Sequence, residues 1–531
     1  MKKIYLAILI LLGIVNLYAQ DYYLIQLNKK ENTEEYYSNP LKMLSQESLD
    51  RRIKYGIQLD EKDIPISNER LNQIKKINLV YNGHSKWLNS LLVSIDDISA
   101  IDELKKLSFV SEVKSLVRNE SADKILQESS QDKRVVNKDI VYGESDNFIK
   151  KIKLDVIHSK GFKGKSMHIG VIDGGFLGAD TITPFKHIFK EKRIKDVYNF
   201  VAKTKNVYQQ HEHGTTVLST MAVNLNGEYV GAAPEANYSL YVTEDTSEET
   251  LKEWMYWVQA AERADSIGVD VINSSLGYDD FDDARYNYSI DDLDGTTAFI
   301  SEGAKIATSR GIMLVVSAGN YALQKWKKIG FPSDPEEVFT IGNILNTNVG
   351  SGTTSYGPNA NGSIKPDVSA LGVSIKTIGS QGTYKLSSGT SFSSPTIAGA
   401  MASLMSAFPK VPLETLKQIV RESGHLFPSH KNNIGYGYPD FSKVYDVLST
   451  LSTKEINPIT FKIYPNPVTS TVKIYTKNII TSIEIINLNG QLIKGKQNSK
   501  EIDISELSNG VYLIRVVYLD GKSEISKVIK K

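Results

Sequence analysis

The segment Gly389-Thr390-Ser391-Phe392-Ser393-Ser394-Pro395 places a serine at the start of a run of small and apolar residues, Thr396 to Leu404. This run predicts a buried helix with other backbone close by, and Pro395 is expected in its first turn, where a missing N–H costs nothing. A serine at a helix N-terminus lies beside unpaired N–H groups and the positive end of the helix dipole. Ser391 is therefore either a helix cap or a nucleophile whose oxyanion these groups would stabilise.

A nucleophilic serine requires an imidazole and a carboxylate that orients it. His213 begins a predicted helix, and Gly214-Thr215 after it permit close backbone approach; His211 is the competing candidate. An apolar strand, His168 to Asp173, ends in a carboxylate before the turn Gly174-Gly175. Each feature is weak alone, because strand-end aspartates often form turns and helix-start histidines often act as caps.

The middle of the chain alternates apolar strands with amphipathic helices. The predicted helices are 251–266 and 296–310, and the predicted strands after them are 269–274 and 312–316. Such alternation predicts a parallel sheet with helices on both faces. Ligands of these sheets bind beyond the carboxyl ends of the strands, where Asp173 and Asn320 are both expected.

The three candidates follow one another as Asp173, His213 and Ser391, which is the subtilisin order and not that of chymotrypsin or of α/β-hydrolases. Over roughly residues 145 to 447 the chain resembles the subtilase family. Seven motifs in the family's order carry the resemblance: Val171-Ile172-Asp173-Gly174-Gly175, His213-Gly214-Thr215, Gly231-Ala232-Ala233-Pro234-Glu235-Ala236, Val271-Ile272-Asn273-Ser274-Ser275-Leu276-Gly277, Ser317-Ala318-Gly319-Asn320, Lys365-Pro366-Asp367-Val368 and Gly389-Thr390-Ser391.

The resemblance implies an α/β fold with a subtilisin-like parallel β-sheet, and it implies roles for individual residues. Ser391 would be the nucleophile, His213 the general base and then acid, and Asp173 the group that orients the imidazole. Asn320 would donate its amide to the oxyanion beside the Ser391 N–H. Ser275-Leu276-Gly277 would pair with an extended substrate and form one wall of the main specificity pocket.

Four positions depart from the family pattern. Thr216 stands where a second histidine is frequent, Ser219 where a glycine is frequent, and Ser393-Ser394 where a small apolar pair is frequent. None of them removes a group that the chemistry needs. No cofactor is expected for the chemistry. Subtilases often bind calcium, but the acidic run Asp279 to Asp283 lacks an ordered ligand spacing, so structural calcium stays open and no metal residue is predicted.

The residues before this domain are typical of an exported precursor. Residues 1–19 have a Lys2-Lys3 head and an apolar run too short to cross a membrane, which predicts a cleaved signal peptide rather than a retained anchor. Residues 20–144 predict a small α+β domain and an exposed linker open to proteolysis. A propeptide fits this arrangement, and a permanent accessory domain is the alternative. The peptidase domain is assigned to residues 145–450.

Residues 461–531 predict a small all-β sandwich. Tyr464-Pro465-Asn466-Pro467-Val468, the strand Gly510 to Val516 and the terminal Lys530-Lys531 resemble the C-terminal sorting domain of the type IX secretion system of Bacteroidetes-type bacteria. The resemblance implies export through the periplasm to the surface or the medium, with the secretion machinery as a partner. A carbohydrate-binding or adhesive sandwich is the alternative.

Composition narrows the function classes. The 531 residues carry a formal net charge of +1, which argues against a nucleic-acid partner, and they include no cysteine, so disulfides cannot stabilise the exported chain. A lipase would require Gly-x-Ser-x-Gly, whereas residues 389–393 read Gly-Thr-Ser-Phe-Ser. An inactive subtilase that only binds is disfavoured because all four catalytic residue types are present. We therefore expect a secreted, monomeric serine endopeptidase that acts on proteins or peptides. Its cleavage preference depends on loops such as 321–335.

Overall fold

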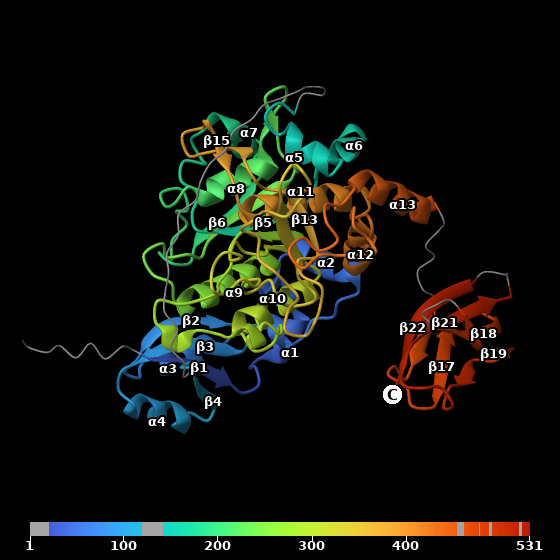
Figure 1. Ribbon diagram of the computed structural model, residues 1–531. Helices are drawn as coiled ribbons and strands as arrows, with labels where there is room; N and C mark the ends of the chain where they lie inside the picture. Colours follow the sequence, from blue (N-terminus) through green and yellow to red (C-terminus); the bar gives the residue numbers. More distant parts are fainter. Residues whose placement is uncertain (1–20, 119–141, 454–460, 477, 488–490, 520–522) are drawn as a thin grey trace, which may run out of the picture. The chain divides into compact units, whose positions relative to one another are not determined.

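The computed structural model describes residues 21–118, 142–453, 461–476, 478–487, 491–519 and 523–531 (Figure 1). The chain divides into two compact units, with the boundary between Val447 and Leu448. The predicted signal peptide and residues 119–141 of the predicted linker lie outside the described residues. No helix within the described ranges is long and apolar enough to cross a membrane.

A seven-stranded sheet forms the centre of the first unit, and every pair of neighbouring strands is parallel. Its order is β13-β12-β11-β10-β5-β9-β6. The strands are β5 (His168–Asp173), β6 (Ile194–Asn199), β9 (Asn237–Val242), β10 (Val271–Ser274), β11 (Met313–Ser317), β12 (Phe339–Ile344) and β13 (Val368–Leu371). Six of the seven are almost entirely buried, as the continuous apolar pattern predicted, whereas the edge strand β6 is only partly buried.

Helices cover both faces of this sheet, which confirms the predicted fold class. Figure 1 shows α8 and α11 on one side and α9 and α10 on the other. The helices are α5 (Asp146–Lys151), α6 (Leu154–Ser159), α7 (Lys186–Lys190), α8 (His213–Ala222), α9 (Leu251–Ser266), α10 (Phe299–Ser309), α11 (Thr390–Ala407), α12 (Leu413–Glu422) and α13 (Phe441–Thr453). Two small antiparallel pairs complete the unit: β7 (Asn224–Leu225) with β8 (Tyr229–Val230), and β14 (Ile375–Ile378) with β15 (Tyr384–Ser387).

The direction of strand addition reverses between β5 and β10. From β5 the chain adds β6 and β9 on one side, and it then places β10 to β13 in succession on the other side. Open parallel sheets bind ligands beyond the carboxyl ends of their strands at such a reversal. Asp173 ends β5, Ser274 ends β10, and Asn320 follows the end of β11 by three residues.

Helix α11 begins earlier than the proline suggested. It starts at Thr390, so Pro395 lies in its second turn, and the prediction of a first-turn proline is wrong. Proline has no N–H to donate to the carbonyl of Ser391, four residues earlier. The Ser275 hydroxyl donates to that carbonyl instead, at 2.9 Å. Pro395 thereby frees a carbonyl at the start of α11 for a bond to the segment that follows β10.

Residues 21–115 form an α+β domain with an antiparallel sheet of order β2-β3-β1-β4. Its elements are β1 (Asp21–Leu27), α1 (Thr33–Ser38), α2 (Gln46–Tyr55), α3 (Asn68–Ile74), β2 (Val80–Ser85), β3 (Ser90–Ile95), α4 (Ser99–Lys106) and β4 (Val110–Ser115). Figure 1 shows this sheet beneath α9. Trp87 and Leu92 belong to the same buried apolar cluster as Trp254 and Met255 of α9, so the two domains share a core.

Buried ion pairs also hold this domain to the sheet unit. Arg51 and Arg52 of α2 both pair with Asp265 near the end of α9, and all three side chains are no more than 2% exposed. Arg51 also donates from Nη1 to the carbonyl of Val269 at 2.5 Å. Losing one partner of a buried pair leaves an uncompensated charge, so these contacts make the domain pairing specific.

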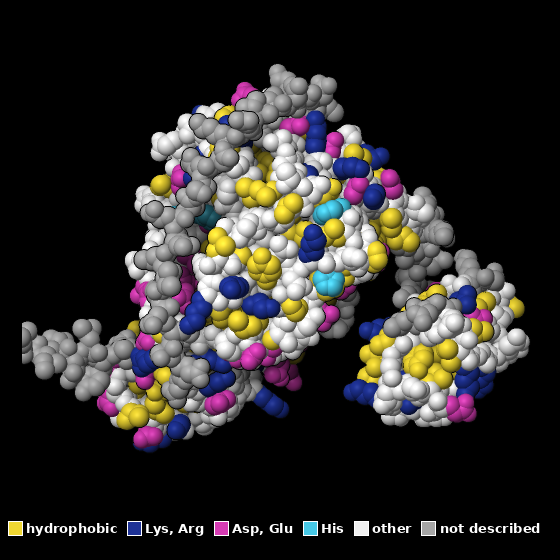
Figure 2. Space-filling view, viewed as in Figure 1, with side chains coloured by type: hydrophobic (Ala, Val, Ile, Leu, Met, Phe, Trp, Pro, Cys, Tyr) yellow, Lys and Arg dark blue, Asp and Glu magenta, His cyan; other side chains and the backbone are white. Residues whose placement is uncertain are grey.

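The second unit has its own core. Its strands are β16 (Phe461–Tyr464), β17 (Thr471–Thr476), β18 (Ile480–Ile486), β19 (Leu492–Gln497), β20 (Glu501–Asp503), β21 (Gly510–Tyr518) and β22 (Ser523–Lys530). They form a three-stranded sheet, β16-β17-β20, and a four-stranded sheet, β19-β18-β21-β22. Apolar residues of both sheets, such as Val472 and Ile485, pack into one cluster, as in a sandwich. Figure 2 shows hydrophobic side chains gathered on the visible face of this unit.

Candidate active site

A carboxylate and an imidazole meet at the end of β5. Nδ1 of His213, the first residue of α8, lies 2.7 Å from Oδ1 of Asp173. Asp173 is fully buried, whereas the His213 side chain is 27% exposed. The Gly174 N–H also donates to Asp173 Oδ1, at 2.8 Å. The carboxylate therefore holds the imidazole through Nδ1 and leaves Nε2 for chemistry.

Electrostatics favour the protonated form of His213. Desolvation acts to lower its pKa, but the charge and hydrogen bond of Asp173 act in the opposite direction and prevail, so the pKa lies above its ordinary value. A smaller contribution of the same sign comes from the carboxylate of Glu244. This imidazole is a stronger base than an isolated histidine.

Gly214 explains how helix α8 comes so close to the end of β5. A Cβ atom on Gly214 would lie 2.4 Å from the carbonyl oxygen of Gly175 and 3.0 Å from Cβ of Asp173. The Gly214 N–H donates to that Gly175 carbonyl at 2.9 Å. Any side chain here would push the helix away and separate His213 from Asp173.

Ser391 is the second residue of α11, beside the unpaired N–H groups of the helix start. Its hydroxyl donates to the carbonyl of Ser275 at 3.2 Å. Within the described part of the chain the hydroxyl makes no hydrogen bond to His213. The neighbouring residue, Phe392, does contact the imidazole, with ring centroids 5.8 Å apart. Helices α8 and α11 pack together, which brings the serine and histidine segments to the same place.

A chain of buried hydrogen bonds fixes Ser391 against β10. The Ser394 hydroxyl donates to Asn273 Oδ1 at 2.9 Å, and Asn273 Nδ2 donates to the Ser275 hydroxyl at 3.0 Å. Ser275 in turn donates to the Ser391 carbonyl that Pro395 leaves free. The sequence showed Ser394 only as a departure from a family pattern, and Asn273 only as part of a motif. The structure gives both residues a place in the support of Ser391.

The side-chain amide of Asn320 is held in one orientation. Its Oδ1 accepts from the N–H of Thr390 at 3.0 Å and from the Thr390 hydroxyl at 3.3 Å. Nδ2 would lie 3.4 Å from a Cβ on Gly389, and it has no acceptor among the described residues. The amide therefore presents two N–H donors beside the start of α11.

The other positions that the sequence singled out lie around this site or within α8. His211 does not contact Asp173; its Nδ1 accepts from the N–H of His213 at 3.2 Å. Thr216 and Ser219 lie buried inside α8, and the Ser219 hydroxyl accepts from the N–H of Ile378 at 3.0 Å. The Leu276 carbonyl accepts from Ser317 at 3.2 Å, so the Ser275 to Gly277 segment lies against the end of β11.

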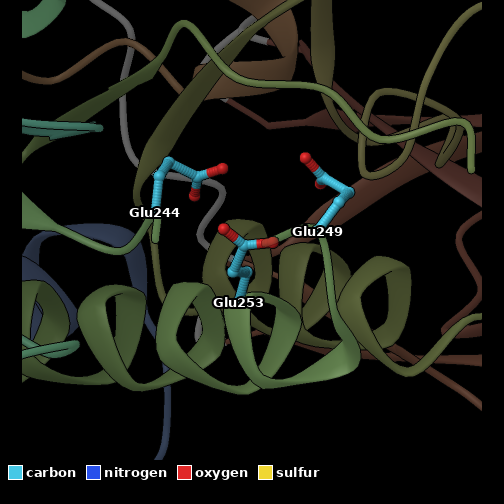
Figure 3. A group of neighbouring side chains, drawn as sticks. All are labelled: Glu244, Glu249 and Glu253. Carbon is cyan, nitrogen blue, oxygen red and sulfur yellow. The ribbon is translucent and has the colours of Figure 1, made fainter. Parts of the chain in front are cut away.

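Three glutamates converge close to Asp173 and His213, and the sequence did not single them out. Figure 3 shows Glu253 rising from the first turn of α9 toward Glu244 and Glu249 in the segment before it. One carboxylate oxygen from each lies within 4.8 Å of the others. Burial, and then repulsion from neighbouring carboxylates, raises the pKa of all three above the ordinary range. Glu253 accepts the N–H groups of Asp245 and Thr250, so it also caps the helix.

Comparisons with known proteins identify the family of each part of the chain. The model of the subtilase family matches residues 164–438, just over half of the chain. The model of the peptidase S8 propeptide domain of Bacteroidota matches residues 22–134, and that of the secretion system C-terminal sorting domain matches residues 462–531.

Individual relatives point the same way. Subtilisin NAT of Bacillus subtilis subsp. natto is 29% identical over 327 residues, which are 61% of this chain and 72% of that protein. Subtilisin of Bacillus pumilus is 30% identical over 264 residues, 49% of this chain and 84% of that protein. A crystal structure of the epidermin leader peptide processing serine protease of Staphylococcus aureus has a TM-score of 0.53 at 16% identity and shares the fold, over 81% of this chain and 99% of that one.

The predicted resemblances are thus confirmed for all three parts of the chain. A propeptide domain precedes the peptidase, and a type IX sorting domain, which indicates export to the surface or the medium, follows it. The chain belongs to the subtilase family and is a subtilisin-like serine peptidase.

Proposed function

We propose that this peptidase hydrolyses internal peptide bonds of protein or peptide substrates through Asp173, His213 and Ser391. The single observation that carries the proposal is the hydrogen bond of 2.7 Å between His213 and the buried Asp173, at the reversal point of the sheet. A serine at the start of α11 lies on the helix that packs against the histidine's own helix. The proposed chemistry uses only side chains and backbone N–H groups of this chain.

The reaction begins with a rotation of Ser391. Its hydroxyl turns from the Ser275 carbonyl toward Nε2 of His213, which takes the proton as the oxygen attacks the substrate carbonyl. Asp173 stabilises the imidazolium that results. His213 then gives the proton to the leaving amine, and an acyl-enzyme on Ser391 remains. Water attacks this ester by the same steps in reverse, and Ser391 is regenerated.

Negative charge develops on the substrate oxygen in both tetrahedral intermediates. Asn320 Nδ2 and the Ser391 N–H are the proposed donors to it. Thr390 fixes the asparagine amide before substrate arrives, so little reorganisation is needed at the moment of reaction. The segment Ser275 to Gly277 is the proposed backbone partner of an extended substrate.

The test is Ser391→Ala in the full-length chain. We expect peptidase activity to vanish, labelling by a fluorophosphonate probe to vanish with it, and the circular dichroism spectrum to remain. If maturation is autocatalytic, the propeptide should also stay attached. Full activity of Ser391→Ala would refute the assignment.

We propose that residues 461–531 determine where the enzyme is delivered and take no part in catalysis. This unit has a core of its own, so its removal should leave the peptidase fold intact. In the native host the truncated enzyme should accumulate in the periplasm, active or activatable, and disappear from the surface and medium. Truncated enzyme at the surface in normal amounts would favour the adhesive alternative.

We also propose that the enzyme works as a monomer, since all proposed catalytic groups come from one chain.

A further inference from the structure

Tyr321, the residue after Asn320, folds its ring back over the chain beside the site. A Cβ atom on Gly319 would lie 2.4 Å from Cε2 and 2.7 Å from Cδ2 of this ring. A Cβ atom on Gly330 would lie 2.8 Å from Cε2. The phenol hydroxyl donates a short hydrogen bond to the carbonyl of Gly277. The Tyr321 side chain therefore contacts three glycines on three different segments. A side chain on Gly319 or Gly330 would collide with the ring.

These three glycines border one space, which we call the primary pocket. Gly277 ends the Ser275 to Gly277 segment, and Gly319 directly precedes Asn320. The segment of Gly330 is tied to the other two: the Gly330 N–H donates to the Ala318 carbonyl at 3.1 Å, and the next residue, Phe331, exchanges two backbone hydrogen bonds with Tyr278 at 2.9 and 3.0 Å. The Tyr321 ring thus fills the space between the backbones of these three segments.

The reaction geometry directs one substrate side chain into this space. The scissile carbon must lie at Ser391 Oγ with its oxygen at Asn320 Nδ2. The residue before the scissile bond carries its side chain on the atom next to that carbon. If the substrate backbone lies along the Ser275 to Gly277 segment, as proposed, this side chain would point between that segment and Gly319, toward the Tyr321 ring.

The ring is anchored in this position. Besides the bond from its hydroxyl to Gly277, its own N–H donates to the Ser355 hydroxyl at 3.0 Å. Burial and the nearby carboxylates, Asp279 first among them, raise the pKa of the Tyr321 phenol well above its ordinary value. The phenol thus keeps its proton and remains a donor to Gly277 throughout the working pH range.

We propose that Tyr321 closes the primary pocket and restricts cleavage to bonds that follow glycine or alanine. This inference rests on the proposed function, because it assumes that Ser391 and Asn320 act on the scissile carbonyl. A phenylalanine or leucine before the scissile bond would have to expel the ring and break its hydrogen bond to Gly277. Exclusion by a clash of this kind gives specificity without any additional contact to the preferred substrate.

The experiment uses the processed, full-length enzyme and peptides that differ only in the residue before the scissile bond: glycine, alanine, leucine and phenylalanine. We expect kcat/KM for alanine to exceed that for phenylalanine by about 100-fold or more. Tyr321→Ala should raise kcat/KM for phenylalanine by about 100-fold while the value for alanine changes by less than about 10-fold. Tyr321→Phe keeps the ring and should keep the preference for small residues.

The control is Tyr475→Ala in β17 of the second unit, where the tyrosine is 58% exposed; it should leave every ratio unchanged. Labelling by a fluorophosphonate probe reports the fraction of each variant that is folded and competent. Wild-type enzyme that cleaves after phenylalanine as well as after alanine would overturn the proposal. So would Tyr321→Ala that labels normally and keeps the wild-type preference. Failure to cleave any peptide of the series despite normal probe labelling would instead overturn the proposed endopeptidase activity.

Discussion

The two halves of the proposed catalytic site differ in how far they are assembled. On the β5 and α8 side, Asp173 and His213 are already joined at 2.7 Å. On the β10 and α11 side, the Ser391 hydroxyl is bonded to the Ser275 carbonyl, within a chain of hydrogen bonds that ends at Asn273 and Ser394. The proposed base is thus already paired with its carboxylate, whereas the proposed nucleophile is bonded elsewhere and would have to turn. The difference suggests that removing the pair should abolish catalysis, and that loosening the serine's support should only slow it.

The largest effect is expected from removing the base. His213→Ala should lower kcat by about 10⁴-fold or more, since no other group takes the serine proton. His211→Ala is the matched control, because His211 has no bond to Asp173, and it should cost less than about 10-fold. Steady-state kinetics on a peptide substrate measures both. A greater loss in His211→Ala would reverse the choice between the two histidines.

Removal of an oxyanion donor comes next. Asn320→Ala should lower kcat by about 10²–10³-fold, the range that loss of one such donor has in a subtilisin, and should leave KM nearly unchanged. The reason is that the Nδ2 bond strengthens only as charge develops on the substrate oxygen. A raised KM with normal kcat would show that Asn320 only binds substrate.

The hydrogen bonds that hold Ser391 in place can be tested by removing two neighbouring hydroxyl groups. Ser394→Ala breaks the bond to Asn273 Oδ1, leaves a buried acceptor unpaired at a cost of about 1–3 kcal/mol, and should lower kcat about 10-fold. Ser393→Ala removes only a bond within α11, to the Thr390 carbonyl, and should change kcat less than about 2-fold. Equal effects of the two substitutions would show that the link to β10 has no part in placing Ser391.

The smallest effect concerns pH. Because the pKa of His213 is raised, kcat/KM should fall as pH drops through this raised pKa, where the imidazole gains a proton and stops acting as a base. Glu244→Gln removes a carboxylate that favours the imidazolium, so the kinetic pKa should move down slightly. Glu506→Gln, on the exposed surface of the second unit, is the control. An upward shift in Glu244→Gln would contradict this sign.

Periodic and continuous hydrophobic patterns in the sequence predicted most of the fold. The 3.6-residue stripe over 251–266 coincides with α9, and the apolar run 168–173 coincides with β5. The helix predicted from Thr296 begins instead at Phe299, because Asp294 accepts the N–H groups of Thr296 and Thr297 in a local turn. Such side-chain competition for backbone donors leaves no periodic signal.

The rest of the site depends on contacts between distant segments. The Arg51 and Arg52 pairs with Asp265 join residues more than 200 positions apart, and a charge on an amphipathic helix does not reveal its partner in advance. The three glutamates, likewise, are spread over ten residues and meet only because the chain turns into α9. Tyr321 belongs to a loop whose path no sequence pattern predicts, and the three glycines around its ring become its neighbours only in the folded chain.

The most direct test of the account is covalent modification of the processed enzyme by a fluorophosphonate, followed by peptide mapping across a pH series. The account predicts a single adduct on Ser391, with a rate that rises with pH through an apparent pKa above that of an ordinary histidine and that collapses in His213→Ala. An adduct on another serine, or a rate on Ser391 that does not depend on His213, would contradict it.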